Sequence, residues 1–223
     1  MLLRLLLCDL RTRIGTFLLV AAVGLPGAII WGIGFGPAAA LPLWAVLLAW
    51  GHCMRIAGDD DKAEVWPFLR VLPVPARVTV GVQYASCVVA VVFYVLITTA
   101  EILIASLVYP HPLPPYSLGS TVAISLSAGI LLVALFNALY FRLGYRNAQP
   151  AMQVLLFALM LVPIKLKVGG QPFFKWVSDV AAQADRVFGH PILLYLTVVL
   201  AVAALTTLSW AYSVSAFRRR EFR

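Results

Sequence analysis

The residues in this chain that are best suited to chemistry form an acidic run, Asp59-Asp60-Asp61, followed three residues later by Glu64. Carboxylates are the ligands that Ca²⁺ and Mg²⁺ prefer. Three consecutive side chains point in different directions, however, and only Asp60 and Glu64 have the i, i+4 spacing that places two carboxylates on one helix face. The run is more typical of a solvated helix start, where the helix dipole favours negative charge.

Two polar residues inside apolar stretches are candidates for translocation or gating, Glu101 and Asn137. Glu101 is the sole acidic residue of its apolar run. It follows Arg77 by 24 residues, which places it ~36 Å further along a helix, near the outer interface. The alternative is an interfacial or helix-contacting carboxylate. The polar residues expected to form hydrogen bonds between helices are Asn137, Thr98, Thr99 and Gln153.

The cysteines and histidines show no pattern of a metal site. Cys8, Cys53 and Cys87 share no ligand spacing, and the adjacent pair His52-Cys53 cannot supply a closed site. The sequence also lacks the P-loop, H-E-x-x-H and G-x-S-x-G motifs. We therefore expect no enzymatic activity and no cofactor in this chain. If the protein moves a solute uphill, another protein must supply the energy.

The composition indicates that lipid is the solvent for most of the chain. Of its 223 residues, 62% are hydrophobic and 12% are charged, against about half and a quarter in soluble domains. The net charge of +8 lies between apolar runs, so it indicates membrane topology and contacts with anionic lipid headgroups rather than nucleic-acid binding. We predict an all-α fold that forms a single membrane domain over residues 1–223.

Six apolar stretches are candidates for spanning helices, each of which needs about 20 residues. They cover residues 14–35, 38–54, 78–100, 118–141, 150–164 and 191–217, and the fifth is the shortest. With the N-terminus inside, only Lys165, Lys167, Lys175 and Arg186 of the 17 lysines and arginines lie outside. The positive-inside rule therefore places both termini in the cytoplasm.

Two further segments are expected at the membrane surface. Residues 2–10 are Leu-rich and contain Arg4 and Asp9, which predicts an interfacial helix on the inner side. Residues 173–188 have apolar residues at helical spacing, which predicts an amphipathic helix on the outer surface. An ordinary outer loop remains the alternative for this second segment.

The coupling segment, as we name residues 58–77, lies between the second and third spans and is the most informative part of the sequence. Asp61 and Glu64 have the spacing of a capping box. Apolar residues follow at i, i+3, i+4 and i+7, namely Val65, Phe68, Leu69 and Leu72. The prolines at 67, 73 and 75 limit the helix to a few turns. Such a helix either transmits force from a soluble partner or lies on the bilayer with Trp66 and Phe68 inserted.

The stretches 60–69 (DDKAEVWPFL) and 72–77 (LPVPAR) resemble the cytoplasmic segment of type 2 ABC transporter permeases. In that family an acidic turn, a short helix and a Leu-Pro-Val-x-x-Arg exit lead into the third span. The layout of the chain is similar as well, with an amphipathic start, six spans and a helical outer insertion before the sixth. Pro67 and the short fifth span depart from the pattern.

The resemblance implies a permease subunit in the bacterial cytoplasmic membrane that dimerises and works with two separate ATP-hydrolysing subunits. ATP and Mg²⁺ would be bound by those partners, and substrate would pass between the two permease copies, usually outward. Contact with the ATPase would involve Asp60, Asp61, Lys62, Glu64, Val65, Trp66, Phe68, Leu69, Leu72 and Arg77.

Two other classes of function are compatible with a membrane bundle. A membrane scaffold or assembly factor could recruit a soluble partner through the same segment without transporting anything. An integral-membrane enzyme acting on lipids would need several polar groups converging near one interface. Glu101 stands alone, which disfavours the enzyme.

Overall fold

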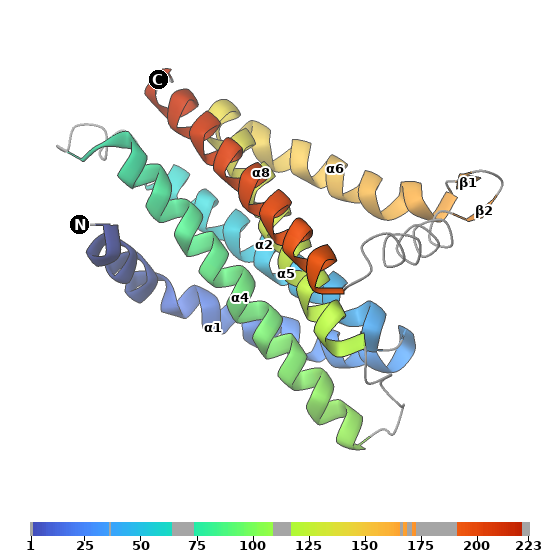
Figure 1. Ribbon diagram of the computed structural model, residues 1–223. Helices are drawn as coiled ribbons and strands as arrows, with labels where there is room; N and C mark the ends of the chain where they lie inside the picture. Colours follow the sequence, from blue (N-terminus) through green and yellow to red (C-terminus); the bar gives the residue numbers. More distant parts are fainter. Residues whose placement is uncertain are drawn as a thin grey trace.

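The computed structural model describes residues 2–35, 37–63, 74–108, 117–165, 167–168, 171–172 and 191–219. Within these residues the fold is almost entirely helical (Figure 1). Its helices are α1 (Leu2–Phe35), α2 (Pro37–Lys62), α4 (Ala76–Val108), α5 (Ser117–Leu143), α6 (Tyr145–Lys165) and α8 (Pro191–Arg219). Strands β1 (Lys167–Val168) and β2 (Gln171–Pro172) form a small antiparallel ribbon beyond α6.

Several helices are longer than the apolar stretches that predicted them. Residues 2–10 are continuous with the first apolar stretch in α1, although Figure 1 shows the first turns at an angle to the rest. Helix α2 starts at Pro37 and α8 at Pro191. Proline suits the first position of a helix because the missing N–H would be unpaired there in any case.

The expectation that the acidic run starts a helix is wrong. Asp59, Asp60 and Asp61 lie in the last turn of α2, which ends at Lys62. The backbone N–H of Ala63 still bonds to the carbonyl of Asp59, at 3.0 Å. The sequence offers no proline between Met54 and Lys62, so nothing stops the helix when its apolar stretch ends. The acidic side chains therefore lie at the helix end that the dipole makes unfavourable for them.

The short fifth stretch also belongs to a longer helix. Helix α6 begins at Tyr145 and has 21 residues, six more than the 15 of the predicted span. Gly144 separates it from α5 with a φ of 81°, a left-handed conformation that glycine adopts without steric cost. The backbone N–H of Gly144 bonds to Tyr140 O and its carbonyl accepts from Ala148, both at 2.9 Å. The two helices therefore join at one residue.

The helices pack so that the chain termini meet at one end of the bundle. Helix α5 packs on α2 and α8, and α1 packs on α2 and α4. Figure 1 shows the N- and C-termini, the start of α4 and the α5–α6 junction at the same end. The predicted topology places all four of these positions in the cytoplasm, and it therefore requires them to lie at one end of the bundle. Which side of the membrane this end faces stays a prediction.

The described bundle has an apolar exterior as well as an apolar core. Fully buried aromatic residues such as Tyr94, Phe136 and Tyr140 fill the core. Large aliphatic side chains point outward, for example Ile104, Leu200 and Leu208, with exposed fractions of 63%, 61% and 66%. Among the described residues, stretches within α4, α5 and α8 are long and apolar enough to cross a membrane: Ala76–Glu101, Val122–Leu143 and Leu196–Arg219. The full set of six spans stays a prediction.

Candidate coupling end of the bundle

The structure describes only part of the predicted coupling segment. Asp60, Asp61 and Lys62 close α2, and Arg77 is the second residue of α4. The other residues predicted to contact an ATPase lie outside the described residues: Glu64, Val65, Trp66, Phe68, Leu69 and Leu72. The amphipathic helix predicted at 173–188 lies outside them as well. What the structure does define is the coupling end, by which we mean the start of α1, the end of α2, the start of α4 and the α5–α6 junction.

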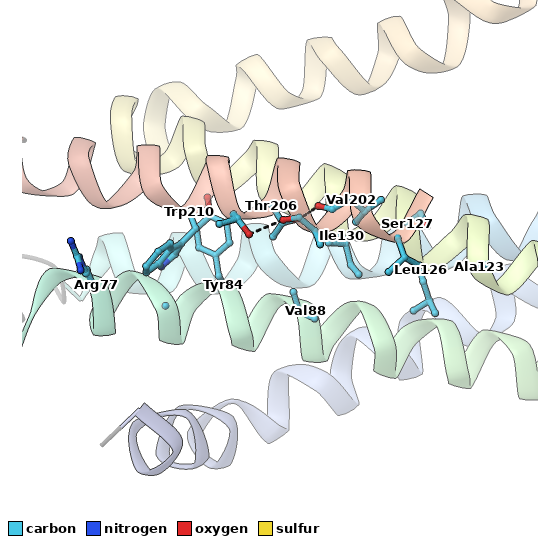
Figure 2. A pocket seen from close by; sticks show the side chains of 14 residues that line it. Arg77, Tyr84, Val88, Ala123, Leu126, Ser127, Ile130, Val202, Thr206 and Trp210 are labelled. Atoms are coloured by element: carbon cyan, nitrogen blue, oxygen red, sulfur yellow. Dashed lines mark hydrogen bonds between the residues drawn. The ribbon is translucent and has the colours of Figure 1, made fainter. Parts of the chain in front are cut away.

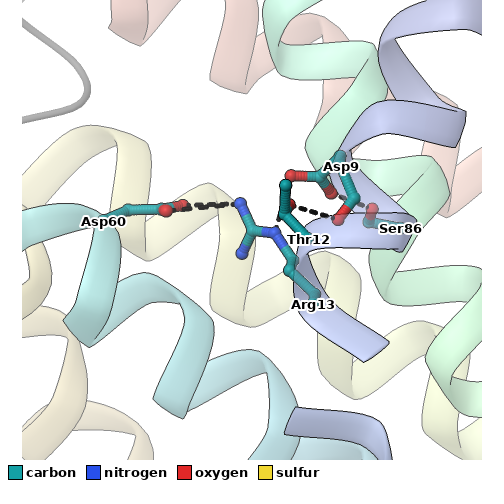
Figure 3. Close-up of polar contacts among 5 residues, drawn as sticks. All are labelled: Asp9, Thr12, Arg13, Asp60 and Ser86. Carbon is teal, nitrogen blue, oxygen red and sulfur yellow. Dashed lines mark hydrogen bonds and ion pairs between the residues drawn. The ribbon is translucent and has the colours of Figure 1, made fainter. Parts of the chain in front are cut away.

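A polar network centred on Arg13 joins three helices at the coupling end (Figure 3). Nη2 of Arg13 in α1 donates to both carboxylate oxygens of Asp60 in α2, at 3.1 and 3.2 Å. Nε of Arg13 donates to Oδ1 of Asp9, one turn earlier in α1, at 2.6 Å. The Ser86 hydroxyl in α4 donates to Oδ2 of Asp9. A displacement of the end of α2 therefore reaches α1 and α4 through side-chain contacts.

This network is largely shielded from solvent, which changes its electrostatics. The side chains of Arg13 and Asp60 are 16% and 12% exposed. Burial raises the pKa of Asp60, and its effect outweighs the opposing influence of Arg13. Burial lowers the pKa of Arg13, but Asp60 and Asp9 together raise it above its ordinary value. Arg13 is thus the cation that compensates two carboxylates, and Asp60 is the member that is costly to keep ionised.

A close contact between Gly58 and Tyr145 ties α6 to α2 at the same end. A Cβ atom added at Gly58 would lie 3.0 Å from both Cζ and Oη of the Tyr145 side chain. A larger residue at position 58 would therefore have to displace the Tyr145 ring by a few tenths of an ångström, whereas glycine lets the ring lie against the last turns of α2. Burial, together with the negative charges of Asp59 and Asp61, raises the pKa of Tyr145.

An aromatic cluster lies deeper in the bundle beneath the Arg13 network. His52 is eight residues before Asp60 in α2, which corresponds to ~12 Å along the helix. Its Nδ1 is 3.1 Å from the hydroxyl of Tyr94 in α4, and that hydroxyl lies 3.3 Å from the carbonyl oxygen of Phe17 in α1. The rings of Phe17 and His52 pack with centroids 4.1 Å apart. The cluster holds the same three helices together as the Arg13 network.

Helix α8 is attached to the bundle through Tyr84 of α4. The Tyr84 hydroxyl lies 2.7 Å from Oγ of Ser209 and 2.8 Å from Oγ of Ser213, both in α8. Ser209 in turn donates to the carbonyl oxygen of Ala134 in α5, at 2.6 Å. Three helices are therefore linked by one tyrosine and two serines.

The residues that link the helices are not the ones that the sequence indicated. Asn137 is fully buried, and its side-chain atoms have no hydrogen-bond partner among the described residues. The Thr98 hydroxyl also lacks a partner there, that of Thr99 bonds within α4 to Val95 O, and Gln153 is exposed. Part of the Arg13 network could be predicted from sequence, because Asp9 and Arg13 have the i, i+4 spacing of an intrahelical ion pair.

The two residues predicted to act in translocation or gating lie apart from the coupling end. Glu101 lies 25 residues beyond the start of α4, towards the opposite end of that helix, and is half-buried. Both of its carboxylate oxygens are buried without a hydrogen-bond partner in the part of the chain that the structure describes. Asn137 is enclosed by neighbouring helices. The structure does not bring the two together, and their roles stay predictions.

Long helices with aliphatic side chains on the outside identify a multi-pass α-helical membrane protein. A family model described as "ABC-2 family transporter protein" matches residues 4–218. The chain therefore belongs to the ABC-2 transporter family, which confirms the resemblance seen in the coupling segment and supports a role as a transport permease. Neither a curated protein nor a solved structure matches it.

Proposed function

We propose that this protein is the permease subunit of an ATP-driven exporter, and that a separate ATP-hydrolysing subunit docks on the coupling segment. The family match over residues 4–218 is the observation that supports this proposal most strongly. The sequence contains no P-loop, so ATP and Mg²⁺ would be bound by the partner. We also propose that the permease has six spans, forms a dimer, lies in the bacterial cytoplasmic membrane and moves its substrate outward.

The coupling end has the connections that such a docking site needs. The coupling segment lies between α2 and α4, and the end of α2 is linked by Asp60 to Arg13 in α1. Gly58 of the same turns contacts Tyr145 at the start of α6. Force applied to the segment would act on α2 and α4 directly and on α1 and α6 through these contacts. Because the helices are packed as rigid rods, a movement at this end is transmitted along their length.

The decisive experiment measures ATPase coupling in the reconstituted complex. The permease is co-expressed and co-purified with a candidate ATP-hydrolysing subunit from the same organism, and Trp66 or Leu69 is replaced with aspartate. We expect loss of complex assembly and of permease-dependent ATP hydrolysis, because a carboxylate would be buried without a partner in the interface. Gly119→Asp is the matched control, since Gly119 is exposed near the start of α5, outside the coupling end, and a Cβ added there would meet none of the described residues. Unchanged assembly in both aspartate variants would contradict the proposal.

Two further measurements separate the permease from a scaffold and test the topology. A scaffold would bind its partner but would give no ATP-dependent flux in proteoliposomes. For topology, Lys62→Cys is labelled in intact cells with a membrane-impermeant maleimide, in a Cys8→Ser background. Lys62 is exposed, whereas Cys53 and Cys87 are buried. We expect labelling only after the cells are opened, and labelling from outside would refute a cytoplasmic coupling segment.

A further inference from the structure

An open groove runs between α4 and α8 over the surface of α5 (Figure 2). Its volume is about 690 Å³. Figure 2 shows Arg77 and Trp210 at one end and Leu126 and Ala123 at the other, with Val88 between them. The groove is separate from the Arg13 network, and of the described residues predicted to contact an ATPase it includes Arg77 alone.

The interior of the groove is apolar even where its lining residues carry hydroxyl groups. Thr206 and Thr207 each donate to the backbone of their own helix, at 2.7 Å to Val202 O and Ala203 O respectively. The Tyr84 hydroxyl is occupied by its hydrogen bonds to α8 and by a longer contact with a carbonyl of α5. A sugar or peptide would find few free hydrogen-bonding groups there. A hydrocarbon chain makes no hydrogen bonds in water, so it would lose none on entering the groove.

The end of the groove at Arg77 is strongly basic. Arg77 and Trp210 also line an adjoining hollow of about 540 Å³, together with Arg218 and Arg219. Arg219 lines a third hollow, of about 370 Å³, which includes Arg142. Among the residues that the structure describes, none that lines these three spaces is acidic. Such a site combines an apolar channel with a cationic mouth.

We propose that the groove binds one anionic phospholipid, with its headgroup phosphate at Arg77 and Arg219 and one acyl chain lying between α4 and α8. From Arg77 to Val88 the groove follows 11 residues of α4, which corresponds to ~16 Å. This is about the hydrocarbon depth of one leaflet, half of a ~30 Å core. A helix of a second copy could fill the apolar part, but it would leave Arg77 and Arg219 without an anion among the described residues.

The lipid site is tested by native mass spectrometry of the full-length permease, purified from nanodiscs that contain equal amounts of phosphatidylglycerol and phosphatidylcholine. We expect one phosphatidylglycerol molecule to be retained in preference to phosphatidylcholine. Arg77→Gln and Arg219→Gln should each lower this preference about fivefold, since a basic residue near an anionic lipid contributes that factor. Arg146→Gln, at an exposed position outside the groove, should leave it unchanged.

A second pair of variants tests the apolar part without changing any charge. Ala203 and its neighbour Ala204 are both exposed, but Ala203 lines the groove and Ala204 lies outside it. Ala203→Phe should abolish lipid retention, and Ala204→Phe should not. Equal retention of the two lipids by the wild type, or retention that survives Ala203→Phe, would overturn the proposal. So would efficient disulfide cross-linking between two copies of an Ala203→Cys variant, because a second protomer would then occupy the groove.

Discussion

Replacing Arg13 should destabilise the protein much more than replacing Asp60, although the two residues form one ion pair. Arg13 compensates both Asp9 and Asp60, so Arg13→Gln leaves two poorly solvated carboxylates without a cation. Removing one partner of a buried pair typically costs 3–5 kcal/mol. Because the network is slightly exposed, we expect about 3 kcal/mol, near the lower limit. For a chain of this size, that corresponds to a melting temperature lower by about 6–12 °C.

Asp60→Asn should cost far less, although it removes the same ion pair. Burial raises the pKa of Asp60 in the folded protein. A carboxyl group with a raised pKa binds its proton more tightly when folded, so its contribution to stability is lost as the pH rises above its ordinary value of 3.8. At pH 7 an uncharged asparagine therefore avoids a cost that the aspartate incurs. Arg13 keeps Asp9, and we expect a change within about 1 kcal/mol.

The assay is a double-mutant cycle on melting temperature in detergent, with Arg13→Gln, Asp60→Asn and the double variant. The double variant should recover part of the loss of Arg13→Gln, because it no longer buries an unpaired Asp60 carboxylate. The matched control is Arg55→Gln, since Arg55 pairs with Asp59 in the same helix at 3.9 Å but both side chains are more than half exposed. That variant should change stability by less than about 0.5 kcal/mol.

The pH dependence provides an independent check of the same reasoning. Protonation of Asp60 removes one of the unpaired charges of Arg13→Gln, so lowering the pH from about 7.5 to about 5.5 should raise the melting temperature of that variant. The rise should be smaller in the double variant, which has no carboxyl group at position 60 to protonate. If Asp60→Asn were as destabilising as Arg13→Gln, or if the two losses were additive, the view that burial dominates at Asp60 would be refuted.

Three further changes test the packing that holds the bundle together. Gly129→Ala places a Cβ 2.7 Å from Cγ1 of Val91, so it should cost about 1–3 kcal/mol in a thermal melt, and the Val91→Ala variant should relieve it. Gly58→Ala should reduce ATPase coupling, because its Cβ would displace the Tyr145 ring, and a Tyr145→Ala background should remove this sensitivity. Tyr84→Phe should lower the melting temperature by a few degrees, since the serine hydroxyls that it leaves in α8 lose a buried partner.

Much of the fold could be predicted from sequence, because lipid imposes a length on each apolar stretch. The stretches predicted at 78–100 and 118–141 lie inside α4 and α5, and the one at 191–217 lies inside α8. The ends of the helices were less predictable. Residues 59–62 are all charged, and charge indicates where a helix leaves the hydrocarbon rather than where it stops. The acidic run therefore resembles the start of the next helix, although no proline separates it from α2.

The polar contacts of the site were harder to predict, for a different physical reason. Asp9 and Arg13 are close in sequence, so their i, i+4 pairing could be expected. Their long-range partners are Asp60 for Arg13 and Ser86 for Asp9. These contacts depend on how α1, α2 and α4 cross, and the spacing of residues in the sequence does not encode that crossing. Nothing in the composition of an apolar run distinguishes Tyr84 from an ordinary core residue, and His52 suggests a metal ligand only through its neighbour Cys53. Their hydroxyl and ring nitrogen nevertheless make the contacts that Asn137 and Thr98 were expected to make.

The position of the acidic run gives α2 a particular role in the proposed mechanism. Three carboxylates in its last turn oppose the helix dipole, so this turn is less stable than a neutral one and depends on Arg13 and on the packing of Gly58. A docked partner that presented basic residues to Asp59 and Asp61 would stabilise the same turn. The end of α2 would then be more ordered with the partner bound than without it. Part of the free energy of docking would thus act on the bundle through the last turn of α2. The Arg13 network would carry that change to α1 and α4, because Asp60 cannot move without its counter-ion.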